Sequence, residues 1–326
     1  MQSIYIGRRT VLAGTAALLA GASFAQQGFP SKPIRLLVPF PPGGSTTVVA
    51  RLLGQKLTER LGQPVVIDNK PGANGVIASE ELLRAPADGH TILMVVNTHA
   101  INPVMMPTLP YDNQRDFAPV TTIYRLELVL AAHPSVPANT LREFVAIARD
   151  KKESVNFAAG DTAGLTHFAA ETFNTQAGTR LQVVPYKGSG PALADLLGGH
   201  VQAYFSSATA VIPHVKAGKL KAYGISGPAR ASALPDVPTF AEAGMPGLDV
   251  GSWAGILASG KTPPELVNRL STEITAVLNL PDVKDQLAAQ GLVPSLVPTD
   301  RFASLIKADT ARFEKIVQTA NIKVDR

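Results

Sequence analysis

The chain has 326 residues, of which 45% are hydrophobic and 17% are charged, and its formal net charge is +5. This length suffices for two domains of ordinary size, and this composition excludes a disordered protein. The chain contains no cysteine. Thiol catalysis, cysteine-based metal sites and lipid attachment through an amino-terminal cysteine are therefore excluded.

The first 25 residues have the organisation of an export signal. Arg8 and Arg9 precede an uncharged apolar run at 11–25, which ends in the small-residue motif ASFA. The run is short for a membrane span, so we expect cleavage near Ala25 and a soluble periplasmic protein. The paired arginines fit a twin-arginine signal as well as an ordinary secretory (Sec) signal.

The basic residues do not form a nucleic-acid-binding patch. Lysine and arginine number 30 against 25 acidic residues, and without Arg8 and Arg9 the excess falls from five to three. The densest group, Lys216, Lys219 and Lys221, falls at an expected helix end, where cations favour the helix dipole. A phosphate-binding face needs a more concentrated patch, so we expect no nucleic-acid partner.

From residue 34 the chain alternates short apolar strands with helical segments. Strands are predicted at 34–40, 64–68 and 91–96, and helices at 46–61 and 76–85. The strands are continuous apolar runs, which is typical of strands buried on both faces. The alternation therefore predicts an α/β fold with a mostly parallel sheet between helices.

A second cycle of the same kind begins near residue 126. It contains predicted strands at 126–132, 155–159, 181–185, 201–206 and 220–226, and predicted helices at 141–150, 165–177 and 191–197.

The last part of the chain has an extended run at 249–257, followed by helices at 264–278, 283–290 and 301–320. A late strand followed by helices is what a chain needs to return and complete its first lobe. We therefore expect lobe one to comprise 26–126 plus 247–326, and lobe two 127–246, with two chain crossings as a hinge.

The segment PFPPGGSTT at 39–47 lies between the first predicted strand and helix. Its two glycines allow close approach of the backbone to a ligand, and the free amides of the helix start favour an anion. A tight turn that needs glycine for geometry alone is the alternative. The segment lacks the third glycine of a dinucleotide fingerprint and the lysine of a P-loop.

Lobe two has a matching turn, AAGDTAGLTH at 158–167. Ligands of open α/β sheets lie at the carboxyl ends of strands, so the two turns could hold the two ends of an anion. Thr98 with His99, and Ser206 with Ser207, also follow predicted strands. A histidine such as His167, taken alone, is more often a packing or capping residue than a ligand contact. Lys187, in the turn at 185–190, could pair with a carboxylate, but a solvated lysine is the more common case.

Catalytic motifs are absent from the sequence. It contains no GxSxG elbow and no HExxH motif, and its six histidines are dispersed without metal-ligand spacing. No acidic pair stands out as a general acid and base. We therefore expect no enzyme activity, no metal and no cofactor.

Sequence blocks across nearly the whole mature chain resemble the Bug (Bordetella uptake gene) family, the substrate-binding receptors of tripartite tricarboxylate transporters. The blocks are PFPPGG at 39–44, NKPGANG at 69–75, ADGHT at 87–91, HAINP at 99–103, DFAPV at 116–120, VPYKG at 184–188, PHVKAGKL at 213–220 and LPDVPT at 234–239.

The resemblance implies a two-lobed type II periplasmic-binding-protein fold that closes on its ligand. It implies a monomer that binds a small carboxylate, either a di- or tricarboxylate or an aromatic carboxylate, and delivers it to integral-membrane subunits. A ligand-presenting adaptor for a membrane sensor kinase is the alternative. The expected ligand-binding residues are Phe40, Pro42, Gly43, Gly44, Ser45, Thr46, Thr47, Thr98 and His99 in lobe one, and Gly160, Thr162, Thr166, His167, Ser206 and Ser207 in lobe two.

One departure from the family pattern bears on the ligand. The family commonly has aspartate where this chain has Thr47. The substitution removes a negative charge beside the ligand turn, so we expect a carboxylate without an amino group.

Overall fold

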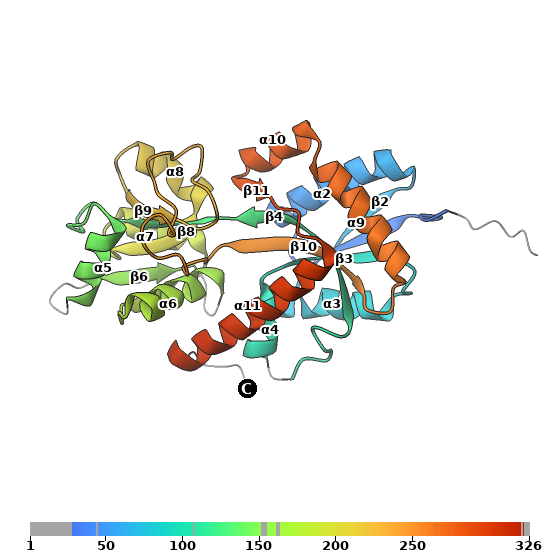
Figure 1. The fold of residues 1–326 in the computed structure, drawn as a ribbon, viewed down its shortest axis with the longest axis horizontal. Coiled ribbons are helices and arrows are strands. Elements are labelled where there is room, and N and C mark those ends of the chain that lie inside the picture. Colours follow the sequence, from blue (N-terminus) through green and yellow to red (C-terminus); the bar gives the residue numbers. More distant parts are fainter. Residues whose placement is uncertain are drawn as a thin grey trace, which may run out of the picture.

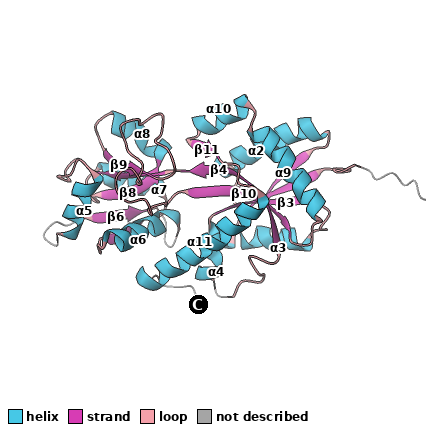
Figure 2. Ribbon diagram, viewed as in Figure 1, coloured by secondary structure: helices cyan, strands magenta, loops and turns pink. Residues whose placement is uncertain are grey.

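The computed structural model describes residues 28–43, 45–106, 108–150, 155–160, 164–320 and 322. The expected export signal, Gly44 and Thr162 lie outside these ranges, and so does the side chain of Ser45. Two β-sheets, each flanked by helices, lie side by side along the long axis of the molecule (Figure 1), and the colouring by secondary structure separates the strands from the helices that cover them (Figure 2).

The larger sheet has six strands in the order β11-β4-β10-β3-β1-β2. Strands β1, β2 and β3 are parallel, whereas β10 lies antiparallel between β3 and β4. The late strand therefore enters the middle of the sheet that the first part of the chain began. The strands span Ile34–Val38 (β1), Val65–Asn69 (β2), Thr91–Val96 (β3), Phe117–Leu126 (β4), Ser252–Ser259 (β10) and Leu292–Pro294 (β11).

Helices cover both faces of this sheet, because its central strands are buried on both sides. Helices α2, α9 and α10 share a core with one face, and α3, α4 and α11 share a core with the other. The helices span Ser45–Leu61 (α2), Val76–Arg84 (α3), Thr98–Met105 (α4), Pro264–Leu278 (α9), Pro281–Ala289 (α10) and Thr299–Ala320 (α11), with a 3-10 turn at Ala73–Gly75 (η1).

The smaller sheet has five strands in the order β7-β6-β8-β5-β9. Strands β6, β7 and β8 are parallel, and β5 is antiparallel to β8 and β9. Helices α5 and α6 pack on one face, and α7 and α8 on the other. The elements span Leu128–Ala132 (β5), Leu141–Arg149 (α5), Asn156–Ala159 (β6), Leu165–Ala177 (α6), Gln182–Pro185 (β7), Ser189–Leu197 (α7), Ala203–Ser207 (β8), Ala208–Lys216 (α8) and Lys221–Ile225 (β9).

The chain crosses between the sheets at two places. β4 ends at Leu126 and β5 begins at Leu128, so only Glu127 separates the two strands. On the return, Leu248 and Val250 still pack in the core of the five-stranded half, and β10 begins at Ser252. The two crossings are thus short segments of extended chain that lie close to each other.

Strand β4 and helix α4 are among the elements that were not expected from the sequence, as are the short strand β11 and the turn η1. β4 contains Pro119, Thr121 and Thr122, which weaken its apolar pattern. The hydroxyl of Thr122 donates to Ser295 O at 2.6 Å, and that of Thr121 donates to Val297 O at 3.1 Å. Acceptors more than 170 residues away therefore make these polar side chains compatible with a buried strand.

Candidate functional site

The carboxyl ends of strands from both sheets meet at the crossings. At the end of β3, Asn97 Oδ1 accepts a hydrogen bond from the hydroxyl of Ser252, the first residue of β10, at 2.9 Å. At the end of β8, Ser207 pairs with Leu128, the first residue of β5. The strand ends that carry the expected ligand residues Thr98, His99, Ser206 and Ser207 therefore lie beside the segments that join the two halves.

The proline-rich loop after β1 is held by hydrogen bonds from the buried side of the loop, made by Thr47 and Asn69. The Thr47 hydroxyl donates to Pro41 O at 3.3 Å and accepts from Asn69 Nδ2 at 3.0 Å. Asn69 Nδ2 also donates to Phe40 O at 2.8 Å. Thr47 is only 1% exposed, so its side chain supports the loop from the protein interior. Sequence reasoning did not single out Asn69, although it lies in one of the family blocks.

The other side of the same loop is exposed to solvent. Pro42 and Gly43 are exposed, and Phe40 packs partly against the core of the six-stranded half. Gly43 has φ of 102°, and a Cβ there would meet nothing within 4 Å. Glycine is thus needed at this position for backbone conformation rather than for space. Thr46 is half-buried in the first turn of α2.

Thr98 and His99 begin α4 and line a small cavity of about 10 Å³ that also contacts Pro39 and Asn102. His99 is 4% exposed, and its Nε2 has no hydrogen-bond partner among the described residues. Burial lowers the pKa of His99 to about 4, against the opposing effect of a hydrogen bond with the backbone of Asn113. The imidazole is therefore neutral at neutral pH and adds no positive charge to the site.

Gly160 and Thr166, on either side of the segment between β6 and α6, are joined by a hydrogen bond. The Thr166 hydroxyl accepts a hydrogen bond from Gly160 N at 2.9 Å. A Cβ on Gly160 would lie 2.8 Å from the Tyr204 hydroxyl and 3.0 Å from Ser189 Oγ. This glycine is therefore required by packing inside the five-stranded half. Thr166 is 7% exposed, so it too supports the turn from within.

The remaining expected residues of this half differ in exposure. His167 is half-buried, with its Nε2 3.9 Å from Glu171 Oε1 one helical turn further along α6. Ser206 is 1% exposed, whereas Ser207 is half-buried and precedes α8. Ser207 and His167 are therefore the side chains of this half that are open to a ligand among those expected and described.

The chain matches the model of the TctC family, the tripartite tricarboxylate transporter family receptors, over residues 49–322. The chain belongs to this family. BugT from Bordetella pertussis is 35% identical over 298 residues, which cover 91% of each chain.

Solved structures agree with the family and show the type II periplasmic-binding-protein fold. A periplasmic transporter is 40% identical, with a TM-score of 0.73 over 91% of this chain and 100% of its own. A protein from R. palustris solved with adipate is 33% identical, with a TM-score of 0.73 over 90% and 99%. MatC from Rhodopseudomonas palustris, with bound malate, is 32% identical, with a TM-score of 0.68 over 89% and 100%.

This TctC-family protein is thus a periplasmic solute-binding protein, and the predicted fold is confirmed. Its family consists of receptors, not enzymes. Within the described residues, no helix combines the length and apolarity needed to cross a membrane.

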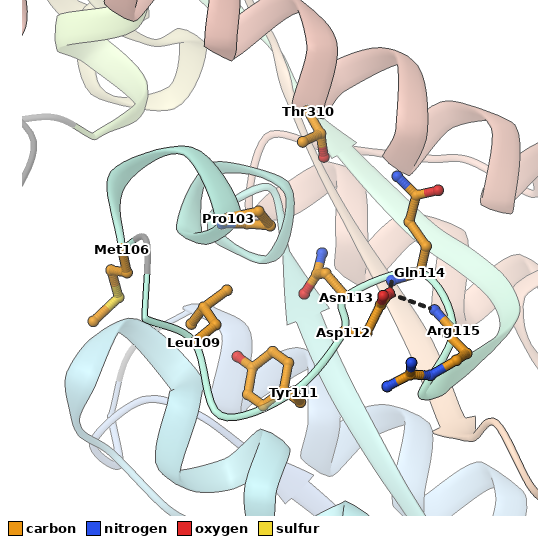
Figure 3. A pocket seen from close by; sticks show the side chains of 9 residues that line it. All are labelled: Pro103, Met106, Leu109, Tyr111, Asp112, Asn113, Gln114, Arg115 and Thr310. Carbon is orange, nitrogen blue, oxygen red and sulfur yellow. Dashed lines mark hydrogen bonds between the residues drawn. The ribbon is translucent and has the colours of Figure 1, made fainter.

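A further pocket lies away from the strand ends. It has a volume of about 700 Å³ and is lined by α4, the loop that follows it and Thr310 of α11 (Figure 3). Asp112 in this loop accepts hydrogen bonds from the amides of Gln114 and Arg115, so the pocket wall is a capped turn. None of the expected ligand residues lines it, and it is not part of the candidate site.

Proposed function

We propose that this receptor binds a di- or tricarboxylate, or an aromatic carboxylate, in a cleft between two lobes that comprise 26–126 plus 247–326 and 127–246. The observation that carries the proposal is the convergence of strand ends from both sheets on the two crossings. Ligands of open α/β sheets occupy such positions, and the crossings can act as a hinge.

Most of the residues proposed to contact the ligand offer a backbone amide or a hydroxyl as a hydrogen-bond donor. The proposed contacts are Phe40, Pro42, Gly43, Gly44, Ser45, Thr46, Thr98, His99, Thr162, His167 and Ser207, with Thr47, Gly160, Thr166 and Ser206 holding their turns. Hydroxyls and the free amides at the starts of α2 and α6 suit a carboxylate at each end. The adipate and malate bound by two relatives support this ligand class.

An amino group in the ligand would lack a partner in this set of residues. None of the proposed contacts is aspartate or glutamate. A buried ammonium needs a carboxylate or several good acceptors to offset the loss of its hydration. We therefore propose that the ligand carries no amino group.

Membership in the TctC family supports delivery of the captured ligand to the membrane subunits of a tripartite transporter by a monomeric receptor. Export by the signal at 1–25 would place the protein where this delivery takes place. Presentation of the bound ligand to a membrane sensor kinase is the alternative function proposed for the same complex of receptor and ligand.

Isothermal titration with matched ligand pairs tests the proposed ligand class. Malate is compared with aspartate, and adipate with 2-aminoadipate, so that each pair has the same chain and the same carboxylates. We expect the ligand without the amino group to bind at least about tenfold more tightly, or about 1.4 kcal/mol. Tighter binding of the amino acid in both pairs would contradict the proposed ligand class. Conversion of a bound ligand to product would contradict the receptor function.

A further inference from the structure

Helix α11 is anchored in the six-stranded half over its first three turns. The Thr299 hydroxyl donates to Val120 O of β4 at 2.9 Å. Phe302 is fully buried and packs edge-on against Trp253 of β10, with ring centroids 5.1 Å apart. One turn beyond Ile306, Asp309 accepts a hydrogen bond from Trp253 Nε1 at 2.7 Å. This part of the helix is therefore fixed to the larger sheet.

The second part of α11 extends past the edge of that half and reaches α6 (Figure 1). A 22-residue helix is about 33 Å long, which is enough to connect the two halves. Phe313 is 3% exposed and packs edge-on against Phe168 of α6, with ring centroids 5.0 Å apart and an interplanar angle of 63°. The helix thus makes a further connection between the halves, besides the two crossings.

Phe168 packs in a different core from its neighbours in α6. Its neighbours Ala169, Ala170 and Phe173 pack in the core of the five-stranded half. Phe168 itself is 1% exposed and packs in the α11 core of the six-stranded half, as the one member that the described part of 127–246 contributes. One side chain of α6 is therefore inserted into the opposite half.

Phe168 lies in the first turn of α6, next to the proposed ligand turn. Its amide donates to Gly164 O at 3.0 Å, and the preceding Thr166 closes the turn through Gly160 N. A shift of Phe168 must therefore move the start of α6, including Thr166 and its hydrogen bond to Gly160. The position of the start of α6 relative to the loop after β1 depends on how Phe168 is held.

We propose that Phe313 is a positioning residue for ligand binding: by holding Phe168 in the core of the six-stranded half, it sets where the start of α6 lies relative to the ligand loops of that half. This inference rests on the proposed function for its effect on the ligand, but not for its effect on the arrangement of the halves.

The physical reason is the cost of separating the two rings. Pulling α6 away from α11 would expose a fully buried phenylalanine to water, which is unfavourable in proportion to the apolar area exposed. Rotation about the contact keeps the rings buried, as in shear motions between packed helices. We therefore expect the Phe168–Phe313 contact to limit the relative movement of the halves. A ligand then has less orientational freedom of the halves to remove when it binds.

The distance between the halves tests the proposal without any ligand. The chain has no cysteine, so Gln55→Cys on α2 and Arg142→Cys on α5, both exposed, provide unique spin-labelling sites. Pulsed electron–electron double resonance then gives the distribution of distances between the two spin labels. We expect Phe313→Ala to broaden this distribution. In Phe313→Leu, which keeps a large apolar side chain, we expect the distribution to stay nearly as narrow as in the unmutated protein. Phe168→Ala removes the same contact from the other helix and should have the same effect.

Phe302→Ala is the matched control, because Phe302 is a similarly buried phenylalanine of the same helix whose ring packs against Trp253 of β10, in the six-stranded half. It should lower the melting temperature as much as Phe313→Ala but leave the distance distribution narrow. If Phe313→Ala and Phe168→Ala both leave the distribution as narrow as that of Phe302→Ala, Phe313 is a core residue only and the proposal is wrong.

Ligand affinity is the second readout. For the dicarboxylate that the unmutated protein binds most tightly, we expect Phe313→Ala to weaken binding by about tenfold and Phe302→Ala by less than about twofold, because only the first loses preorganisation. Equal weakening by both variants would overturn the positioning role. Failure of the unmutated protein to bind any carboxylate would instead contradict the proposed function, and the distance measurement would still decide the role of Phe313.

Discussion

The guanidinium Nη2 of Arg125 lies 2.6 Å from Oδ1 of Asp249, so a single ion pair joins the two segments in which the chain crosses between the sheets. Nε of the same side chain donates to Glu127 Oε1 at 2.9 Å. Glu127 is buried, and its other oxygen accepts from the Ser226 hydroxyl. A Cβ on Gly251 would lie 2.8 Å from this carboxylate, so the crossings are packed tightly around it.

Replacement of Arg125 should therefore destabilise the fold. In Arg125→Met the buried carboxylate of Glu127 keeps the Ser226 hydroxyl but loses its charged partner. Breaking a buried pair by removal of one member leaves an uncompensated charge, and we expect a loss of about 3 kcal/mol in the free energy of unfolding. Urea denaturation measures this loss.

Arg230→Gln is the control for this prediction. Arg230 pairs with Glu242 at 2.8 Å, but both side chains are more than 40% exposed. Exposed pairs contribute little, so we expect a change below about 1 kcal/mol. Similar losses in Arg125→Met and Arg230→Gln would mean that Glu127 is compensated by other groups.

Thr47→Val tests the support of the proline-rich loop. Valine keeps the shape of the buried side chain but removes the hydroxyl that joins Pro41 O to Asn69. Leaving buried polar groups without this partner should cost about 1–2 kcal/mol of stability. It should also weaken dicarboxylate binding severalfold, because the loop loses its fixed position. Titration and thermal unfolding measure the two effects.

The matched variant is Thr58→Val in the same helix. The Thr58 hydroxyl donates to Gly54 O and accepts from Val65 N, so it also joins two backbone groups, but away from the loop. We expect a similar loss of stability with unchanged affinity. Weaker ligand binding in Thr58→Val than in Thr47→Val would show that affinity follows global stability instead of loop position.

His99 should make the protein sensitive to acid. Its folded pKa of about 4 lies below the ordinary value of 6.5, so its neutral form favours the folded state. The contribution is complete above pH ~6.5 and is lost as the pH falls towards ~4, by up to about 3 kcal/mol. In His99→Gln this loss should be absent from urea denaturation curves measured across the same interval.

His200→Gln is the comparison for His99, because His200 is exposed. We expect the free energy of unfolding of His200→Gln to change between pH 6.5 and 4 in the same way as that of the unmutated protein. If His99→Gln follows the same course as well, the acid sensitivity arises from other groups.

The strand–helix alternation and the two-sheet fold were predictable from the sequence because their signals are local. Apolar runs such as TILMVV at 91–96 are buried on both faces wherever they lie in a sheet, and the structure has β3 at Thr91–Val96. The glycine-containing turns were equally visible. At Gly43 a positive φ accounts for the residue, whereas at Gly160 the neighbouring Tyr204 and Ser189 account for it.

The sequence by itself thus determined most of the segments that form strands and helices, since propensity and periodicity are properties of neighbouring residues. Only the tertiary structure decided which core receives each buried side chain. Phe168 and Ala169 are adjacent and both buried, yet they pack in opposite halves of the molecule. Likewise Thr47 supports its loop only because Asn69, on the neighbouring strand, brings an amide to its hydroxyl. A helical pattern shows that a face is buried, but the partner of that face is set by contacts between segments that are distant in the chain.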